Sequence, residues 1–273
     1  MTDPLVYNIP ARMIDAYRGR NLIIRSSLPA ELADCLPRVA VSRLRFIQLL
    51  SVSADSSALE GAGENVPLEI FLGDPGQYQR LYDFTNLLDT HPVRIAIRVV
   101  PGFSKAVKLA TSLNYAVKLE IEQHDEILIE EIESVLDLYL HRSYVRHPIE
   151  FFQSLLLCLY RNEPVSLWEI AEESPAQVRF ITDDGEETIS KRFAGVRLAV
   201  KLNKFVDTFA QELISEKREC HDCEFFSFCS GYFKWPDKAY SCAGVKRVFR
   251  TLVSASQEVR EDLASYEAMG AQT

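Results

Sequence analysis

The stretch PLEIFLGDPGQYQRLYDFTNLLDTHPVRIAIRVV (67–100) decides the fold class. It opens with a β-prone apolar run (67–73), continues with a segment of helical pattern (76–89) and closes with a second apolar run (93–100). Two strands separated by about 10–15 residues of helical pattern are typical of a βαβ unit, whose strands are parallel. The stretch therefore predicts an α/β protein.

The same alternation extends on both sides of this stretch. Further β-prone runs occur at 22–26, 45–52 and 116–122, and segments of helical pattern occur at 30–39 and 103–114. Several of the runs are apolar on both faces of the pleat, as a covered parallel sheet requires. Periodicity alone leaves two architectures open, an open doubly wound sheet and a partial (β/α) barrel.

The pattern changes in the second half of the chain. The segment 174–192 reads as a hairpin, because Asp184-Gly185 supplies the positive φ of a tight turn. Pro148 is expected at the first turn of one helix. Long amphipathic helices are expected at 125–142, 147–162, 194–218 and 244–269, and a loop at 53–65. We expect two domains, residues 1–165 and 166–273.

Composition limits the classes of partner. The chain has 273 residues, of which 47% are hydrophobic and 25% charged, and its net charge is −9. An acidic chain lacks the positive electrostatic field that attracts nucleic acids and anionic membranes. No apolar run reaches the length of a membrane span, and residues 1–19 lack a secretory signal pattern. We therefore expect no nucleic-acid partner, no membrane association and a cytoplasmic location.

Four of the six cysteines lie in ECHDCEFFSFCSGYFKWPDKAYSC (219–242), namely Cys220, Cys223, Cys229 and Cys242. In a reducing compartment, clustered cysteines are metal ligands more often than disulfides. Four thiolates in one short segment can surround a single tetrahedral ion or one cubane cluster. The aromatic residues between them would limit access of solvent. The residues alone leave structural zinc and an iron–sulfur cluster both open.

The spacing Cys220-x2-Cys223-x5-Cys229-x12-Cys242 resembles the SPASM domain of radical SAM enzymes. The resemblance implies that these four cysteines hold one auxiliary [4Fe–4S] cluster. In the family, a further cysteine of the run belongs to a second auxiliary cluster, and Phe233 stands at that position. No cysteine occurs between 159 and 219, where other ligands of the second cluster would lie. The resemblance therefore implies one cluster and not two.

A weaker resemblance covers the first half. Leu72-Gly73-Asp74-Pro75 is similar to the Gly-Gly-Glu-Pro strand end of radical SAM barrels, a segment that contacts the amino group of SAM. The Cys-x3-Cys-x2-Cys motif of the SAM-cleaving cluster is absent, since Cys35 is the one cysteine before residue 158. The chain thus resembles a pseudo-radical-SAM protein, a degenerate partial (β/α) barrel followed by a SPASM-like domain. No catalytic residue is carried over, and SAM is not expected to bind.

These features predict a non-catalytic iron–sulfur accessory protein. It would assist a complete radical SAM enzyme, or another peptide- or cofactor-maturation enzyme, by transferring electrons or presenting a peptide substrate. Two alternatives stay open: an enzyme that binds a small molecule in the barrel, and an interaction module with structural Zn²⁺. Candidate ligand-binding residues are Asp74, Arg94 and Arg98. Asp74 could instead cap the following helix, and the two arginines could form salt bridges.

Overall fold

The computed structural model describes residues 5–52 and 55–270. Its strands are β1 (Val6–Pro10), β2 (Asn21–Ser26), β3 (Leu44–Leu49), β4 (Leu68–Leu72), β5 (Val93–Arg98), β6 (Ala116–Glu120), β7 (Ile149–Glu150), β8 (Val178–Ile181) and β9 (Glu187–Thr188). They form one sheet in the order β7-β6-β5-β4-β3-β2-β1-β8-β9. Neighbouring strands from β7 to β8 are parallel, and the β8–β9 pair is antiparallel. The chain is therefore an α/β protein with a mostly parallel sheet.

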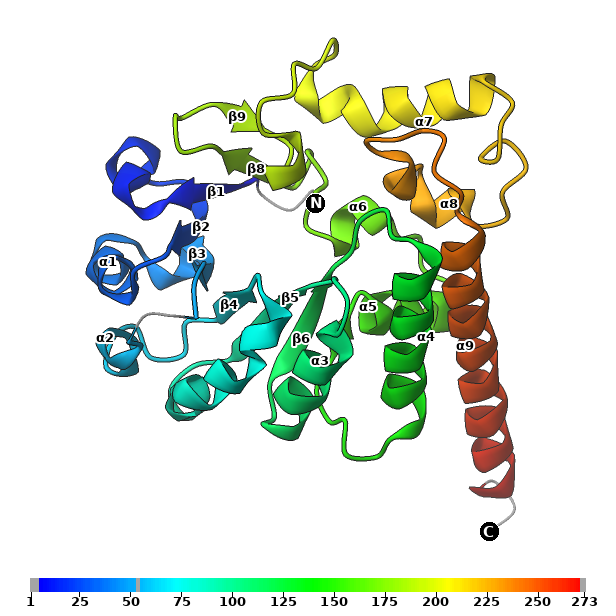
Figure 1. Cartoon of the computed structure of the whole chain (residues 1–273), viewed down its shortest axis with the longest axis horizontal. Helices are drawn as coiled ribbons and strands as arrows, with labels where there is room; N and C mark the ends of the chain where they lie inside the picture. The colour runs from blue at the N-terminus through cyan, green and yellow to red at the C-terminus, as the bar shows by residue number, and fades with distance from the viewer. Residues whose placement is uncertain (1–4, 53–54, 271–273) are drawn as a thin grey trace.

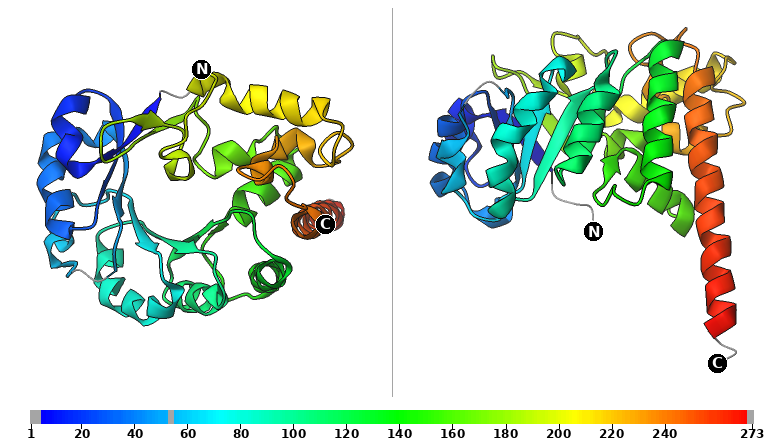
Figure 2. Two further views of the ribbon diagram at one scale, coloured as in Figure 1. Left: turned by 45° about the horizontal axis from the view of Figure 1, so that its top comes forward. Right: turned by 60° about the horizontal axis from the view of Figure 1, so that its bottom comes forward.

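Strands β1 to β7 follow one another in chain order, whereas a doubly wound sheet reverses direction at a switch point. The sheet curves, with helices along its outer face (Figure 2). This arrangement is compatible with a partial barrel. The helices are α1 (Pro29–Cys35), α2 (Ser57–Glu60), the 3-10 segment η4 (Pro75–Asp89), α3 (Phe103–Ser112), α4 (Glu126–His141), α5 (Phe152–Arg161), α6 (Leu167–Ile170), α7 (Phe205–Ser215), α8 (Phe226–Cys229) and α9 (Ala243–Gly270).

The two faces of the sheet carry different residues. On the outer face, Ile24, Ile70 and Ile95 are fully buried in the main core, which also contains Phe84 of η4. On the inner face, a small apolar cluster of Val6, Ile23, Phe46 and Val178 lies at one end of the strands. The inner face also carries polar and charged residues, and together with apolar side chains such as Phe71 and Phe180 they line the interior cavity described below.

The C-terminal half packs against the end of this sheet. Gly185, with φ of +86°, turns the β8–β9 hairpin, and β8 pairs with β1. Helix α9 packs beside α4 and α5 and extends beyond them (Figure 1). The Phe193 and Trp235 rings stack at 4.5 Å and connect the hairpin region to the cysteine segment. The division into domains at residue 165 stays a prediction. No helix in the described part of the chain is long and apolar enough to cross a membrane.

The predicted strands at 22–26, 45–52, 67–73, 93–100 and 116–122 are confirmed as β2 to β6, and the hairpin as β8–β9. The helices expected at 125–142 and 244–269 are confirmed as α4 and α9.

Other expectations were wrong. Pro148 does not open a helix, because residues 149–150 pair with β6 as β7 and α5 starts at Phe152. The helix expected at 194–218 spans only Phe205–Ser215, because the chain turns at Gly195 with φ of +75° and residues 196–201 form no helix before a short 3-10 turn at Leu202–Lys204. The loop expected at 53–65 contains the short helix α2, and positions 53 and 54 lie outside the described residues. Strand β1 was missed.

Candidate functional site

The four clustered cysteines line one cavity in the C-terminal half. All six cysteines of the chain are described, and all are free thiols. The cavity is lined by Glu219, Cys220, Cys223, Phe225, Phe226, Cys229, Phe233, Lys234, Cys242, Val245, Lys246 and Phe249. The remaining two cysteines lie elsewhere: Cys35 is buried in α1, and Cys158 is on α5. The structure therefore brings together the four cysteines that the sequence singles out.

Local backbone structure explains how a short segment delivers four thiols to one place. Cys220 and Cys223 lie in the turn between α7 and α8, Cys229 is the last residue of α8, and Cys242 directly precedes α9. The chain reverses at Gly231, where φ is +77°. A Cβ atom built at this position would lie 2.3 Å from Leu213 Cδ1, so the turn requires glycine.

Burial opposes ionisation of these thiols, and nearby donors favour it. Burial raises the pKa of Cys229 to about 11, although the backbone N–H groups of residues 231–233 donate hydrogen bonds to its sulfur. Burial likewise raises the pKa of Cys242 to about 12, partly offset by the positive charge of Lys234. Thiols held in this way become ligands when a bound metal removes their protons.

Two lysines add positive charge beside the thiols. Lys234 is only 4% exposed, and its Nζ donates a hydrogen bond to Glu219 Oε2 at 2.7 Å. Lys246 Nζ lies 2.9 Å from Glu219 Oε1. Burial would raise the pKa of Glu219, but hydrogen bonds from the two lysines lower it to about 2. Glu219 also accepts the backbone N–H of Cys242 at 3.2 Å, which fixes the start of α9. Two cations and one anion thus leave net positive charge next to four potential thiolates.

Aromatic rings close the remaining walls. Phe249 of α9 lies against Phe225 and Phe228, with ring centroids 5.4 and 5.0 Å away. Phe233 is buried and lies 6.0 Å from the Phe249 ring. Phe233 therefore fills space in the wall of the four-cysteine cavity.

The chemistry of this donor set fits a thiolate-bound metal group: four thiols, backbone N–H groups at one sulfur, two lysines and an apolar wall. The cavity itself is small, about 20 Å³. Within residues 5–52 and 55–270, no group of three or more His, Cys, Asp or Glu side chains is placed so that it could hold a metal ion. The cysteines thus share a cavity without forming a preassembled site. Binding of a cluster would therefore require residues 219–242 to rearrange.

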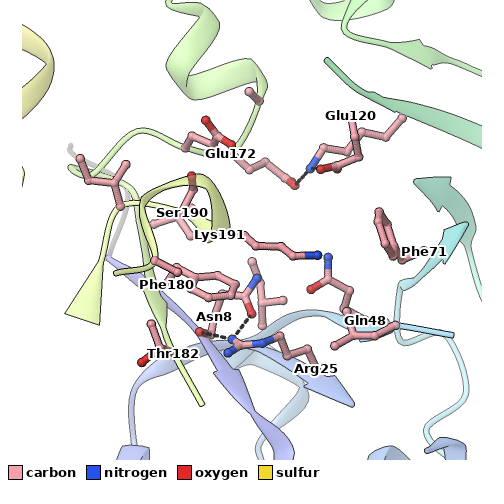
Figure 3. Close-up of a pocket in the computed structure, with 18 of the residues that line it drawn as sticks. Asn8, Arg25, Gln48, Phe71, Glu120, Glu172, Phe180, Thr182, Ser190 and Lys191 are labelled. Carbon is pink, nitrogen blue, oxygen red and sulfur yellow. Dashed lines mark hydrogen bonds and ion pairs between the residues drawn. The ribbon is translucent and has the colours of Figure 1, made fainter. Parts of the chain in front are cut away.

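A second, larger cavity of about 460 Å³ lies inside the curved sheet (Figure 3). Inward-facing residues of neighbouring strands line it, among them Asn8 of β1, Arg25 of β2 and Gln48 of β3. The β8–β9 hairpin and the segment that follows it cover one side with Phe180, Thr182, Ser190 and Lys191.

Arg94 lies in an ion network at the base of this interior. Its guanidinium contacts Glu69, which is 1% exposed, and lies 3.0 Å from Glu172 Oε2. Lys118 Nζ donates to the same Glu172 oxygen at 2.9 Å. Burial would raise the pKa of Glu172, but Lys118 and Arg94 together lower it well below its usual range. Arg94, predicted as a ligand-binding residue, is thus engaged by two carboxylates of the protein.

None of the three predicted residues lines the 460 Å³ cavity, and Arg94 instead lines a neighbouring cavity of about 830 Å³. Asp74 caps η4, because its Oδ1 accepts the backbone N–H of Gly76 at 2.9 Å. This is the alternative that the sequence left open. Arg98 is exposed at the end of β5. A binding role for either residue stays a prediction.

Arg25 was missed by sequence reasoning, although a signal existed. It is the charged residue within the apolar run of β2. Charged side chains are rarely buried in a strand unless they are paired, so its position indicates a specific partner or ligand. Glu172 lies in a turn and Lys191 opens the three-residue 3-10 helix Lys191–Phe193, and elements this short have no periodicity that would mark them.

Comparison of the chain with protein-family models, with curated proteins and with solved structures finds no match.

Proposed function

We propose that this chain is a non-catalytic iron–sulfur accessory protein of the pseudo-radical-SAM kind, with a SPASM-like segment that holds one [4Fe–4S] cluster. Cys220, Cys223, Cys229 and Cys242 would be its ligands. The observation that carries the proposal is that these four cysteines line one cavity, while Cys35 and Cys158 do not. A thiolate-bound cluster supplies one-electron transfer, with a potential set by burial and by hydrogen bonds to sulfur.

The surroundings support this role. The backbone donors at Cys229 and the lysines beside Glu219 would stabilise the negative charge of a thiolate-bound cluster. The partner would be a complete radical SAM enzyme or another maturation enzyme, to which the protein passes electrons or presents a peptide. Structural Zn²⁺ on the same cysteines is the alternative, and it would make the chain an interaction module.

One pair of variants tests the ligand assignment. Cys229→Ser should lose most of the bound iron after anaerobic purification, while Cys158→Ser should retain it. A reduced sample of the wild-type protein should give an EPR signal of a [4Fe–4S]⁺ centre, and addition of SAM should leave that signal unchanged. Equal iron in the two variants would contradict the ligand assignment. SAM cleavage by the protein would contradict the non-catalytic role.

A second candidate function is binding of a small molecule in the barrel interior. The observation that favours it is the cavity of about 460 Å³, a size within the range of ligand pockets. The two functions use different residues, since no cysteine lines this cavity.

A further inference from the structure

The lining of the interior cavity contains both apolar and charged side chains. Phe71 and Phe180 contribute aromatic rings, and Leu50 and Ile189 contribute aliphatic surface. The charged and polar residues lie between them, as Figure 3 shows for Arg25, Lys191 and Gln48. A cavity of this kind suits a ligand with an apolar body and one polar group. The sign of the charge that such a ligand would carry follows from which side chains are already paired.

The acidic residues of the cavity are mostly neutralised by the protein. Glu172 is held by Arg94 and Lys118. Glu173 accepts hydrogen bonds from Arg192 Nε at 3.1 and 3.0 Å. Asp183 has a side chain that is 73% exposed to solvent and lies 3.4 Å from Arg12. Lys118 is shared by two carboxylates, because its ammonium is bonded to Glu172 and lies 3.6 Å from Glu120, the fourth acidic residue of the lining.

Arg25 is different, because it is a buried cation without a buried counterion. It is 5% exposed, and its Nη1 donates to the carbonyl oxygen of Asn8 at 2.8 Å and to Asn8 Oδ1 at 3.0 Å. Its Nη2 donates to the carbonyl oxygen of Ile181. These acceptors are neutral. Among the described residues, the carboxylate near Arg25 is that of solvent-exposed Asp183, whose Oδ1 lies 3.9 Å from Arg25 Nη2.

Two consequences follow from this environment. Burial lowers the pKa of Arg25 to about 10, and Asp183 only partly offsets this effect. The three hydrogen bonds also leave part of the five-donor guanidinium without a protein acceptor in the described part of the chain. A buried charge is costly unless it is paired. Arg25 is therefore a preformed site for an anion.

Lys191 and Ser190 are two further hydrogen-bond donors in the lining of the cavity. Lys191 reaches into the cavity from the segment after β9, with Nζ 5.0 Å from the Phe71 ring centroid (Figure 3). The described residues provide no carboxylate partner for it. Ser190 lines the same cavity, is 8% exposed, and its hydroxyl has no hydrogen-bond partner among the described residues. Two cations and a hydroxyl donor thus line the same cavity.

We propose that the interior cavity binds a carboxylate-bearing ligand, with the carboxylate at Arg25 and Lys191 and an apolar group between Phe71 and Phe180. The carboxylate belongs either to a free small carboxylic acid or to the C-terminus of a peptide. The inference rests on the second candidate function and is independent of the cysteine site. Iron binding and carboxylate binding can therefore fail separately.

Isothermal titration calorimetry on the full, anaerobically purified chain tests the proposal with matched pairs of ligands. The first pair is 3-phenylpropionate and its amide, and the second is N-acetyl-Gly-Phe with a free or an amidated C-terminus. Loss of a charge-assisted hydrogen bond weakens binding by about tenfold or more, so at least one acid should bind about tenfold more tightly than its amide. The pair that shows the difference identifies the source of the carboxylate. Equal binding of acid and amide in both pairs overturns the proposal.

Variants locate the anion site. Arg25→Gln and Lys191→Gln should each weaken binding of the acid about tenfold while leaving binding of the amide unchanged. Lys108→Gln is the matched control, because Lys108 is exposed on α3 and does not line the cavity; it should bind as the wild type does. Arg25→Gln loses hydrogen bonds to Asn8 and Ile181 and is first checked for folding by circular dichroism. If it does not fold, Lys191→Gln decides, and acid binding equal to wild type in that variant overturns the proposal.

Discussion

Lys234 Nζ lies 2.7 Å from Glu219 Oε2, and both residues line the cavity that the four cysteines share. Glu219 also holds Lys246 and the backbone N–H of Cys242. One carboxylate thus fixes two cations and the last of the four thiols. The cavity would hold a thiolate-bound group in a setting with compensating positive charge.

The first prediction concerns this charge. Lys234→Met removes the buried cation but keeps the length of the aliphatic chain, so thiolates become harder to form at Cys220 and Cys242. We expect a clearly reduced iron content, and a cluster that is lost faster during dilution in chelator. Lys238→Met is the control, since Lys238 does not line the cavity. It pairs with Glu212 of α7 and with Glu216, the residue that follows α7. The same iron content in both variants would show that Lys234 has no such role.

The second prediction concerns Glu172. Glu172→Gln leaves Arg94 and Lys118 without this counterion inside the sheet, and it should destabilise the protein by about 3–5 kcal/mol. Urea unfolding at neutral pH measures this change. Glu163→Gln, a change of a half-exposed glutamate 4.0 Å from Arg161, should cost less than about 1 kcal/mol.

The same carboxyl predicts a pH dependence. Its pKa is lower in the folded chain than its ordinary value of 4.5. The stability it contributes is therefore fully present above pH 4.5 and is lost as the pH falls below that value towards the folded pKa. The stability difference between wild type and Glu172→Gln should be constant from neutral pH to about pH 5 and shrink in more acidic solution. A difference that grows on acidification would contradict this assignment of charges.

The third prediction uses two glycines with similar backbones. Gly231 and Gly195 have φ of +77° and +75°, but a Cβ atom at Gly231 would meet Leu213 at 2.3 Å, whereas nothing lies within 4 Å at Gly195. Both alanine variants carry backbone strain of about 1 kcal/mol. Gly231→Ala adds a clash and should cost about 1–3 kcal/mol more. Equal unfolding free energies for the two variants would mean that the packing around the Gly231 turn adjusts to accommodate the added methyl group.

The fourth prediction concerns the aromatic wall. Phe233→Ala opens space beside the cysteines and should destabilise the protein by about 3–5 kcal/mol. Solvent and oxygen would then reach the thiols, so the visible absorbance of a bound cluster should decay faster in air. Phe233→Leu keeps most of the volume and is expected to decay at nearly the wild-type rate. If all three proteins lose absorbance equally fast, the ring does not protect the site.

The alternation of apolar runs was sufficient to predict strands β2 to β6, because each run is buried on the helix-covered face. It was not sufficient for β1, whose five residues include Asn8 and Pro10 and which is recognised only through its pairing with β2 and β8. Residues 149–150 form a strand because they pair with the edge of β6. This is a tertiary interaction, which the presence of Pro148 in the sequence does not predict.

For the site, the sequence was informative where ligands are close together in the chain. One short segment contains Cys220, Cys223, Cys229 and Cys242. Their spacing therefore predicts that the four side chains line one cavity. Arg25 and Lys191 are far apart in the sequence and line the same cavity only because β8 pairs with β1. Such a constellation follows from the sheet order, which local patterns do not contain.

The most direct test of the central claim is the metal content of the wild-type chain. Anaerobically purified and reconstituted protein should contain about four irons and about four acid-labile sulfides per chain, with broad absorbance near 400 nm. The Cys229→Ser protein, treated in the same way, should contain little of either. Colourless wild-type protein with about one zinc per chain, and no iron after reconstitution, would contradict the account and establish the zinc alternative.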